Sequence, residues 1–133
     1  MANTPTKTAA VVDNVQPIVA MPLGTSGASP TNATTTAYAA SLVVKATAGV
    51  IYAISGYNAK VSAQWVQIHD AASLPGDTAV PKVLIYVAAS SSFSMILNAY
   101  GRAFTTGIVV CNSSTGPTKT IGAADCWFDV QYV

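Results

Sequence analysis

An all-β fold is the class that this sequence predicts, namely an antiparallel β-sandwich with jelly-roll topology as the first choice. The bulky apolar residues are mostly Val, Ile and Tyr, which suit a pleated, half-buried surface. No window shows helical periodicity, and the chain has no Glu and few Lys or Arg, the residues that favour helices. From residue 41 onward, short apolar runs alternate with turn residues, and seven or eight such strands are typical of a sandwich.

The chain of 133 residues is long enough for one domain with a real core and too short for two ordinary ones. Residues 1–40 differ from the rest, because Thr, Ala, Pro, Asn and Ser dominate them. We therefore expect an extended N-terminal arm over residues 1–40 and a β-sandwich domain over residues 41–133. The arm carries more apolar side chains than a plain linker, and the expected partner-binding anchors in it are Ile18, Val19, Met21 and Leu23.

The strands expected after the arm are, in order, residues 41–45, 50–55, 62–70, 82–89, 93–97, 102–113 and 126–133. Only four residues separate the first two runs, which predicts a hairpin. Turns are expected at residues 56–60, which contain Gly56 and Asn58, and at residues 98–101.

Two of these runs predict which side chains face the core. Residues 82–89 are continuously apolar, so this strand is expected to be covered on both faces. The last run alternates, and its expected core side is formed by Cys126, Phe128, Val130 and Tyr132.

Charge is the second informative property of the sequence. Charged residues make up 8% of the chain, against about 25% in a typical soluble domain. The surface must therefore be covered by Thr, Ser, Asn and Ala or by other protein chains, which favours an assembly component over a catalyst. The net charge of +1 comes from scattered residues, so no nucleic-acid partner is expected. No apolar stretch predicts a membrane partner or an export signal, so synthesis in the cytoplasm is expected.

Groups for catalysis or metal binding are scarce. His69-Asp70, with Ser73 nearby, is the only combination from which a general base could be proposed, and no triad signature surrounds it. We therefore expect a structural His, no enzyme activity and no cofactor. The five Asp residues are dispersed, so no metal site is expected. Cys111 and Cys126 are expected to be buried, reduced thiols on neighbouring strands.

Aromatic side chains offer a possible binding surface. Trp65 and Trp127 both lie opposite the apolar side of their strands, and Tyr57 and Tyr100 accompany turn residues. Most aromatic residues in a small sandwich belong to its core. Amphipathic rings on a surface, however, commonly contact a partner or stack on carbohydrate.

The segment GYNAKVSAQWVQIHDAASLPGDTAVP, together with YGRAFTTGIVVCNSSTGPTKTIGAADCWFDVQYV, resembles small β-sandwich proteins encoded among the structural genes of tailed bacteriophages. The resemblance runs from Gly56 to the end of the chain and leaves the arm uncovered. Its recurrent positions are Gly56-Tyr57-Asn58, His69-Asp70 and Gly101-Arg102, and none is a catalytic signature.

The resemblance implies a virion protein, such as a capsid decoration (cement) protein or a head or tail fibre component. A cement protein would bind the major capsid protein and copies of itself, here expected as a homotrimer, with the arm laid along the shell. The alternative is a tail or fibre module that binds host-surface carbohydrate through Trp65 or Trp127. Both interpretations place the protein in the virion.

Overall fold

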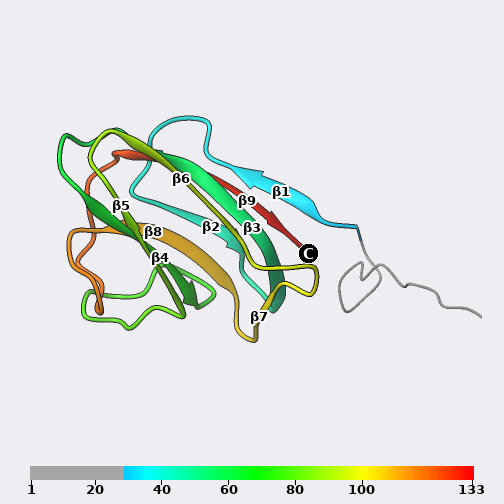
Figure 1. Cartoon of the computed structure of the whole chain (residues 1–133). Coiled ribbons are helices and arrows are strands. Elements are labelled where there is room, and N and C mark those ends of the chain that lie inside the picture. The colour runs from blue at the N-terminus through cyan, green and yellow to red at the C-terminus, as the bar shows by residue number, and fades with distance from the viewer. Residues whose placement is uncertain (1–28) are drawn as a thin grey trace, which may run out of the picture.

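The computed structural model describes residues 29–133, which form two antiparallel sheets packed face to face (Figure 1). The expected antiparallel β-sandwich is confirmed. Its nine strands are β1 (Thr31–Thr34), β2 (Ser41–Lys45), β3 (Gly49–Asn58), β4 (Gln64–Asp70), β5 (Val83–Val87), β6 (Ser91–Ile96), β7 (Arg102–Phe104), β8 (Ile108–Ser113) and β9 (Cys126–Tyr132). Eight of them follow residue 40, in agreement with the seven or eight expected. The described residues contain no helix that could span a membrane.

The five-stranded sheet has the order β1-β9-β3-β6, and the short β7 also pairs with β3. The four-stranded sheet has the order β2-β8-β4-β5. The chain therefore changes sheet after most strands. The hairpin expected between residues 41–45 and 50–55 is wrong, because β2 pairs with β8 while β3 pairs with β9, β6 and β7. The short Ala46–Thr47–Ala48 connection crosses from one sheet to the other.

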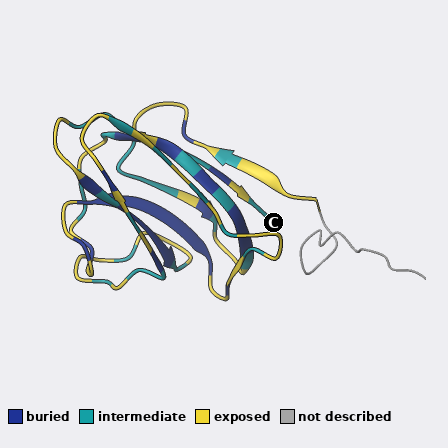
Figure 2. Ribbon diagram, viewed as in Figure 1, coloured by how far each residue is buried: buried dark blue, intermediate teal, exposed yellow. Residues whose placement is uncertain are grey.

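The core lies between the sheets and is formed by buried residues of both, which are dark blue on the strands in Figure 2. The alternation expected in the last strand is confirmed, since Cys126, Phe128 and Val130 are fully buried and Tyr132 packs against the core. Gly56 lies opposite Phe93 and Phe128. A Cβ at Gly56 would lie 2.0 Å from the backbone carbonyl oxygen of Trp127 and 2.6 Å from the Phe93 ring, so this close approach of backbone requires glycine.

The sheet begins before the expected domain boundary. Thr31–Thr34 pairs with β9, and Ala39 forms a bridge with Cys126, so residues 31–40 take part in the sandwich. The expected anchors Ile18, Val19, Met21 and Leu23 lie outside the described residues.

Three local expectations are corrected by long-range pairing. Gly56 and Asn58 belong to β3, and the turn follows them. The run 102–113 is two strands in different sheets, separated by a bend at residues 105–107. Residues 82–89 are not covered on both faces, since β5 is an edge strand whose Leu84 and Tyr86 are exposed.

The turn expected at residues 98–101 is confirmed. Asn98 and Gly101 both have positive φ, at 67° and 71°. The Asn98 Oδ1 atom accepts hydrogen bonds from the amides of Tyr100, at 2.8 Å, and Gly101, at 3.2 Å. Asn and Gly are the residues that tolerate this backbone region best.

Candidate functional site

The outward side of the four-stranded sheet is covered by two connections, residues 71–82 and residues 114–125. Register places Gln67 opposite Cys111, and His69 opposite Val109, on the side of the sheet away from the core. All four side chains are nevertheless buried. The two connections therefore form a lid of the fold itself over this side, which we call the covered face.

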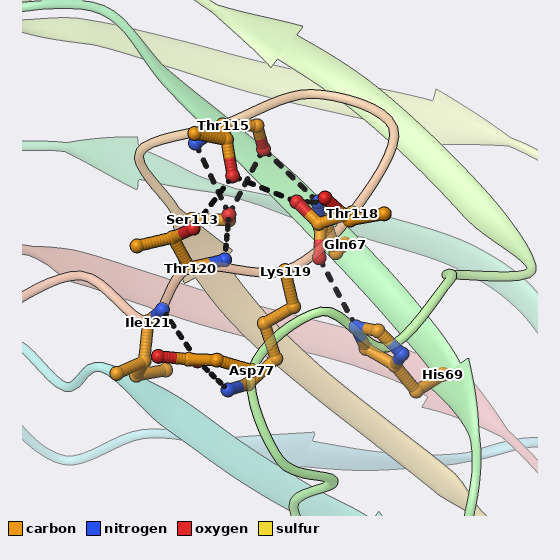
Figure 3. Close-up of polar contacts among 9 residues, drawn as sticks. All are labelled: Gln67, His69, Asp77, Ser113, Thr115, Thr118, Lys119, Thr120 and Ile121. Carbon is orange, nitrogen blue, oxygen red and sulfur yellow. Dashed lines mark hydrogen bonds and ion pairs between the residues drawn. The ribbon is translucent and has the colours of Figure 1, made fainter.

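Gln67 holds one of these connections on the sheet (Figure 3). Its Nε2 atom lies within hydrogen-bond distance of the carbonyl oxygens of Thr115 (3.1 Å), Gly116 (2.8 Å) and Thr118 (3.3 Å). The Thr115 and Thr118 carbonyls also accept hydrogen bonds from the hydroxyls of Ser113 and Thr115, whereas Gln67 is the donor to the buried Gly116 carbonyl.

His69 orients that amide. Its Nε2 atom lies 3.1 Å from Oε1 of Gln67. Because the Gln67 nitrogen donates to carbonyls, its oxygen must accept, so the imidazole carries its proton on Nε2. Burial and the nearby Lys119 charge lower the pKa of His69, which favours the neutral ring. The structure therefore gives His69 a structural task.

Lys119 joins the two connections to each other. Its side chain is only 2% exposed, and its Nζ lies 2.6 Å from Oδ1 of Asp77, whose side chain is 51% exposed. The amide of Ile121 donates to the same oxygen at 3.0 Å. Hydrogen bonding to Lys119 lowers the pKa of Asp77. Main-chain bonds from Lys119 to Ala79 and from Thr78 to Lys119 complete the link.

Asp70 fixes the bend between β7 and β8. Its carboxylate accepts hydrogen bonds from the backbone amides of Thr105, at 3.0 Å, and Thr106, at 2.7 Å, and from Lys82 Nζ, at 3.0 Å. The backbone bonds are the main cause that holds the pKa of Asp70 well below its ordinary value. The recurrent pair His69-Asp70 is thus engaged in holding loops.

Cys111 and Cys126 are both free and buried, as expected, but they do not lie on neighbouring strands. Cys111 is on β8 beneath the covered face, whereas Cys126 is on β9 in the core. Burial raises the pKa of Cys111 to about 11 and also raises the pKa of Cys126. Neither thiol has the character of a nucleophile.

The outward side of the five-stranded sheet has no such lid within residues 29–133, and we call it the open face. Partner residues in the register lie on the same side of the sheet, and they form three rows. The rows are Trp127-Tyr57-Ser92, then Thr34-Asp129-Ser55-Ser94, then Asn32-Gln131-Ala53-Ile96. An aromatic row therefore lies beside rows of small and polar side chains.

The aromatic row borders a groove of about 490 Å³ lined by Ala37, Tyr38, Tyr57 and Trp127. Tyr38 is 52% exposed and Tyr57 is 37% exposed, while Trp127 is half-buried. A second depression, over the polar rows, is lined by residues that include Ser55, Ser94 and Asp129. The two hollows lie over neighbouring rows, because successive outward positions on a strand are about 7 Å apart.

The two tryptophans singled out in the sequence have different surroundings. Trp65 makes an edge-to-face contact with Tyr86, with ring centroids 5.2 Å apart, and a Cβ at Gly116 would lie 3.3 Å from its ring. Trp127 has no aromatic partner among residues 29–133 and faces the groove. Tyr38, which the sequence assigned to the arm, joins Trp127 only because Ala39 pairs with Cys126.

Within residues 29–133, no three His, Cys, Asp or Glu side chains gather closely enough to hold a metal ion. Comparison of the chain with protein-family models, with curated proteins and with solved structures finds no match. Function must therefore be argued from the two faces.

Proposed function

We propose that this chain is a structural protein of a bacteriophage virion, a capsid decoration (cement) protein that binds the major capsid protein and stabilises the shell. It would act as a homotrimer on the capsid surface. The assignment to a virion rests on the resemblance of residues 56–133 to structural proteins of tailed bacteriophages. The proposed mode of action, which is burial against other protein chains, rests on the composition of the sandwich surface.

The main support is how the described residues use their charges. Asp70 and Asp77 are each paired with a Lys, and Asp129 accepts hydrogen bonds from Asn32 and Thr34. Ten large hydrophobic side chains of the described residues are exposed, among them Val61, Val80 and Tyr100. The buried centres of protein interfaces are similarly depleted of charge and enriched in aromatic residues. Such a surface suits a subunit held among many copies.

The strand order supports jelly-roll topology for the sandwich. Strands β1, β9, β3 and β6 face β2, β8, β4 and β5, and the chain passes repeatedly between the two sets, as in two interlocked Greek keys. Jelly rolls occur in viral capsid domains, and also in lectins and cupins. The virion role draws on this likeness as a fold-level analogy.

Cryo-electron microscopy of the phage particle tests the proposal directly. We expect density for the sandwich over junctions between major capsid protein subunits. Density only at the tail would contradict a cement role, and absence of the chain from purified particles would contradict a virion role. Light scattering of the purified chain tests the homotrimer, for which a monomer mass is the contrary result.

Residues before β1 are proposed to carry the attachment, with Ile18, Val19, Met21 and Leu23 as apolar anchors. Since β1 begins at Thr31, deletion of residues 2–28 keeps all nine described strands, whereas deletion of residues 2–40 would also remove β1. We expect the shorter deletion to give a folded protein that no longer binds particles lacking the native copy. Retained binding would exclude these anchors.

A further inference from the structure

We propose that the open face is a binding site for a neutral oligosaccharide, stacked on the rings of Tyr38, Tyr57 and Trp127 and hydrogen-bonded to Asp129. Glycan binding by this face would leave the covered face and the N-terminal segment for attachment to a particle. It is therefore a second activity, and it does not depend on the role as a cement protein.

The aromatic rings of the groove make no aromatic pair within residues 29–133. The aromatic contacts within residues 29–133 are Trp65 with Tyr86 and Phe93 with Phe128. Tyr38, Tyr57 and Trp127 line one groove without stacking on each other. Within the same residues, no hydrogen-bond partner engages the Trp127 indole N–H or the two tyrosine hydroxyls. The groove thus offers ring faces for the C–H side of a sugar and polar atoms for its hydroxyls.

Hydrogen bonds hold the Asp129 carboxylate in place through one of its two oxygens. Its Oδ1 atom accepts hydrogen bonds from Asn32 Nδ2, at 2.7 Å, and from Thr34 Oγ1, at 2.5 Å. Among residues 29–133 no donor reaches Oδ2. Two side chains of the neighbouring strand β1 therefore fix the carboxylate, and the remaining oxygen is an acceptor for a ligand hydroxyl. A fixed group loses little conformational entropy when it binds.

The shape of the face suits an extended ligand. From Trp127 to Gln131 the outward positions of β9 span about 14 Å, at about 3.4 Å per residue. The depression beside Asp129 is lined by small side chains, namely Ser55, Ser94 and Ala53. A chain of sugar rings can therefore pass from the aromatic row onto the polar rows. The length fits an oligosaccharide better than a single ring.

Charge favours a neutral glycan over a protein as the occupant. Asp129 is the only charged residue in the three rows, and the rows carry no cation. A protein surface that covered this carboxylate would have to supply a compensating charge, because an unpaired buried charge is costly. Sugar hydroxyls would donate to it directly while leaving it partly hydrated.

Isothermal titration calorimetry of the full chain tests the proposal, with cellohexaose, maltohexaose, laminarihexaose and chitohexaose as probes. A microarray of neutral bacterial and synthetic oligosaccharides widens the search. We expect at least one probe to bind with Kd of about 1 mM or tighter, which corresponds to about −4 kcal/mol. Trp127→Ala and Tyr57→Ala should each weaken that binding at least tenfold, and Asp129→Asn should weaken it several-fold.

Trp65→Phe is the matched control, because it changes the other tryptophan and should leave affinity unchanged. Circular dichroism and thermal unfolding verify that each variant is folded, and Trp127→Phe, which keeps a ring, should retain most of the binding. No binding to any array member overturns the proposal, as does binding that survives loss of Trp127 and Tyr57 together. The proposal would also be overturned, in favour of a protein interface, if the native chain bound no glycan and Trp127→Ala abolished its self-association.

Discussion

The two outward faces of the sandwich follow the same strand alternation, but one is buried under connections and the other is exposed. On the four-stranded sheet, the outward residues Gln67, His69 and Cys111 are buried under two connections. On the five-stranded sheet, the outward rows that contain Trp127, Tyr57 and Ser94 lie open. Alternation along a strand therefore fixes which side a residue faces, whereas the long connections decide whether that side meets water.

Polarity has a different meaning on each face. Beneath the lid, a polar group must find partners within the protein, and Gln67 does so with three carbonyl oxygens. On the open face, polar atoms such as Asp129 Oδ2 can be satisfied by water or by a ligand. We therefore expect substitutions on the covered face to change stability and substitutions on the open face to change binding.

The largest difference should come from a pair of glutamines. Gln67→Ala removes the amide that holds residues 115–118, leaves the buried Gly116 carbonyl without a donor and leaves His69 Nε2 without its acceptor. We expect it to lower the free energy of unfolding by about 3 kcal/mol, measured by urea denaturation. Gln131→Ala, at an exposed outward position of β9, should change it by less than about 0.5 kcal/mol. Equal effects would contradict the contrast between the faces.

Acid should destabilise the protein through the carboxylates that hold connections. The folded-state pKa values of Asp70 and Asp77 lie below the ordinary value of 3.8. Their stabilisation is therefore complete above that pH and is lost as pH falls through and below it, because the unfolded state then binds more protons. We expect the thermal midpoint to fall between about pH 5 and pH 2.

Asp70→Asn and Asp77→Asn test the origin of that fall. Each variant should be less stable than the native protein at pH 7 and should lose less stability on acidification. Lys119→Gln should reduce the loss of stability on acidification in the same way as Asp77→Asn, since Lys119 is the main cause of the lowered Asp77 pKa. Unchanged pH dependence in all three variants would mean that other groups control acid unfolding.

The sequence predicted the inner side of the sandwich well and its outer sides poorly. Val66 and Ile68, or Phe128 and Val130, can be assigned to the core from alternation alone, because each strand repeats locally with period two. The burial of Gln67 depends on residues about 50 positions later, and no local pattern encodes that contact. The same holds for the failed β2–β3 hairpin, since both strands find partners distant in sequence.

The candidate site was only half predictable for the same reason. Trp65 and Trp127 have similar positions in their strands, so the sequence could not distinguish them. Tyr86 and Gly116 engage Trp65, whereas Tyr57 and Tyr38 leave Trp127 facing a groove. The different surroundings of the two tryptophans arise because connections cover the outward side of the four-stranded sheet and leave that of the five-stranded sheet open.

The rates at which the two thiols react should distinguish the covered face, where Cys111 lies, from the core, where Cys126 lies. Both cysteines are buried with raised pKa, so alkylation of the native protein by iodoacetamide should be slow. Cys111 lies beneath a connection, and exposure of Cys126 requires the sheets to separate. In mild urea we expect Cys111 to be labelled at least tenfold faster than Cys126, as measured by peptide mass spectrometry. Labelling of both at one rate would show that the lid opens only with the whole fold.

A small effect on stability is expected at the edge of the open face. Thr34→Ala removes one of two hydrogen bonds to Asp129 Oδ1, and Asn32 still donates to that atom. Because the site is exposed, water can replace the hydroxyl, and the loss of stability should be no more than about 1 kcal/mol. The same variant loosens the carboxylate and should weaken glycan binding measurably. A large stability loss would instead mean that the β1–β9 row supports the fold, and that the open face is not free to serve a ligand alone.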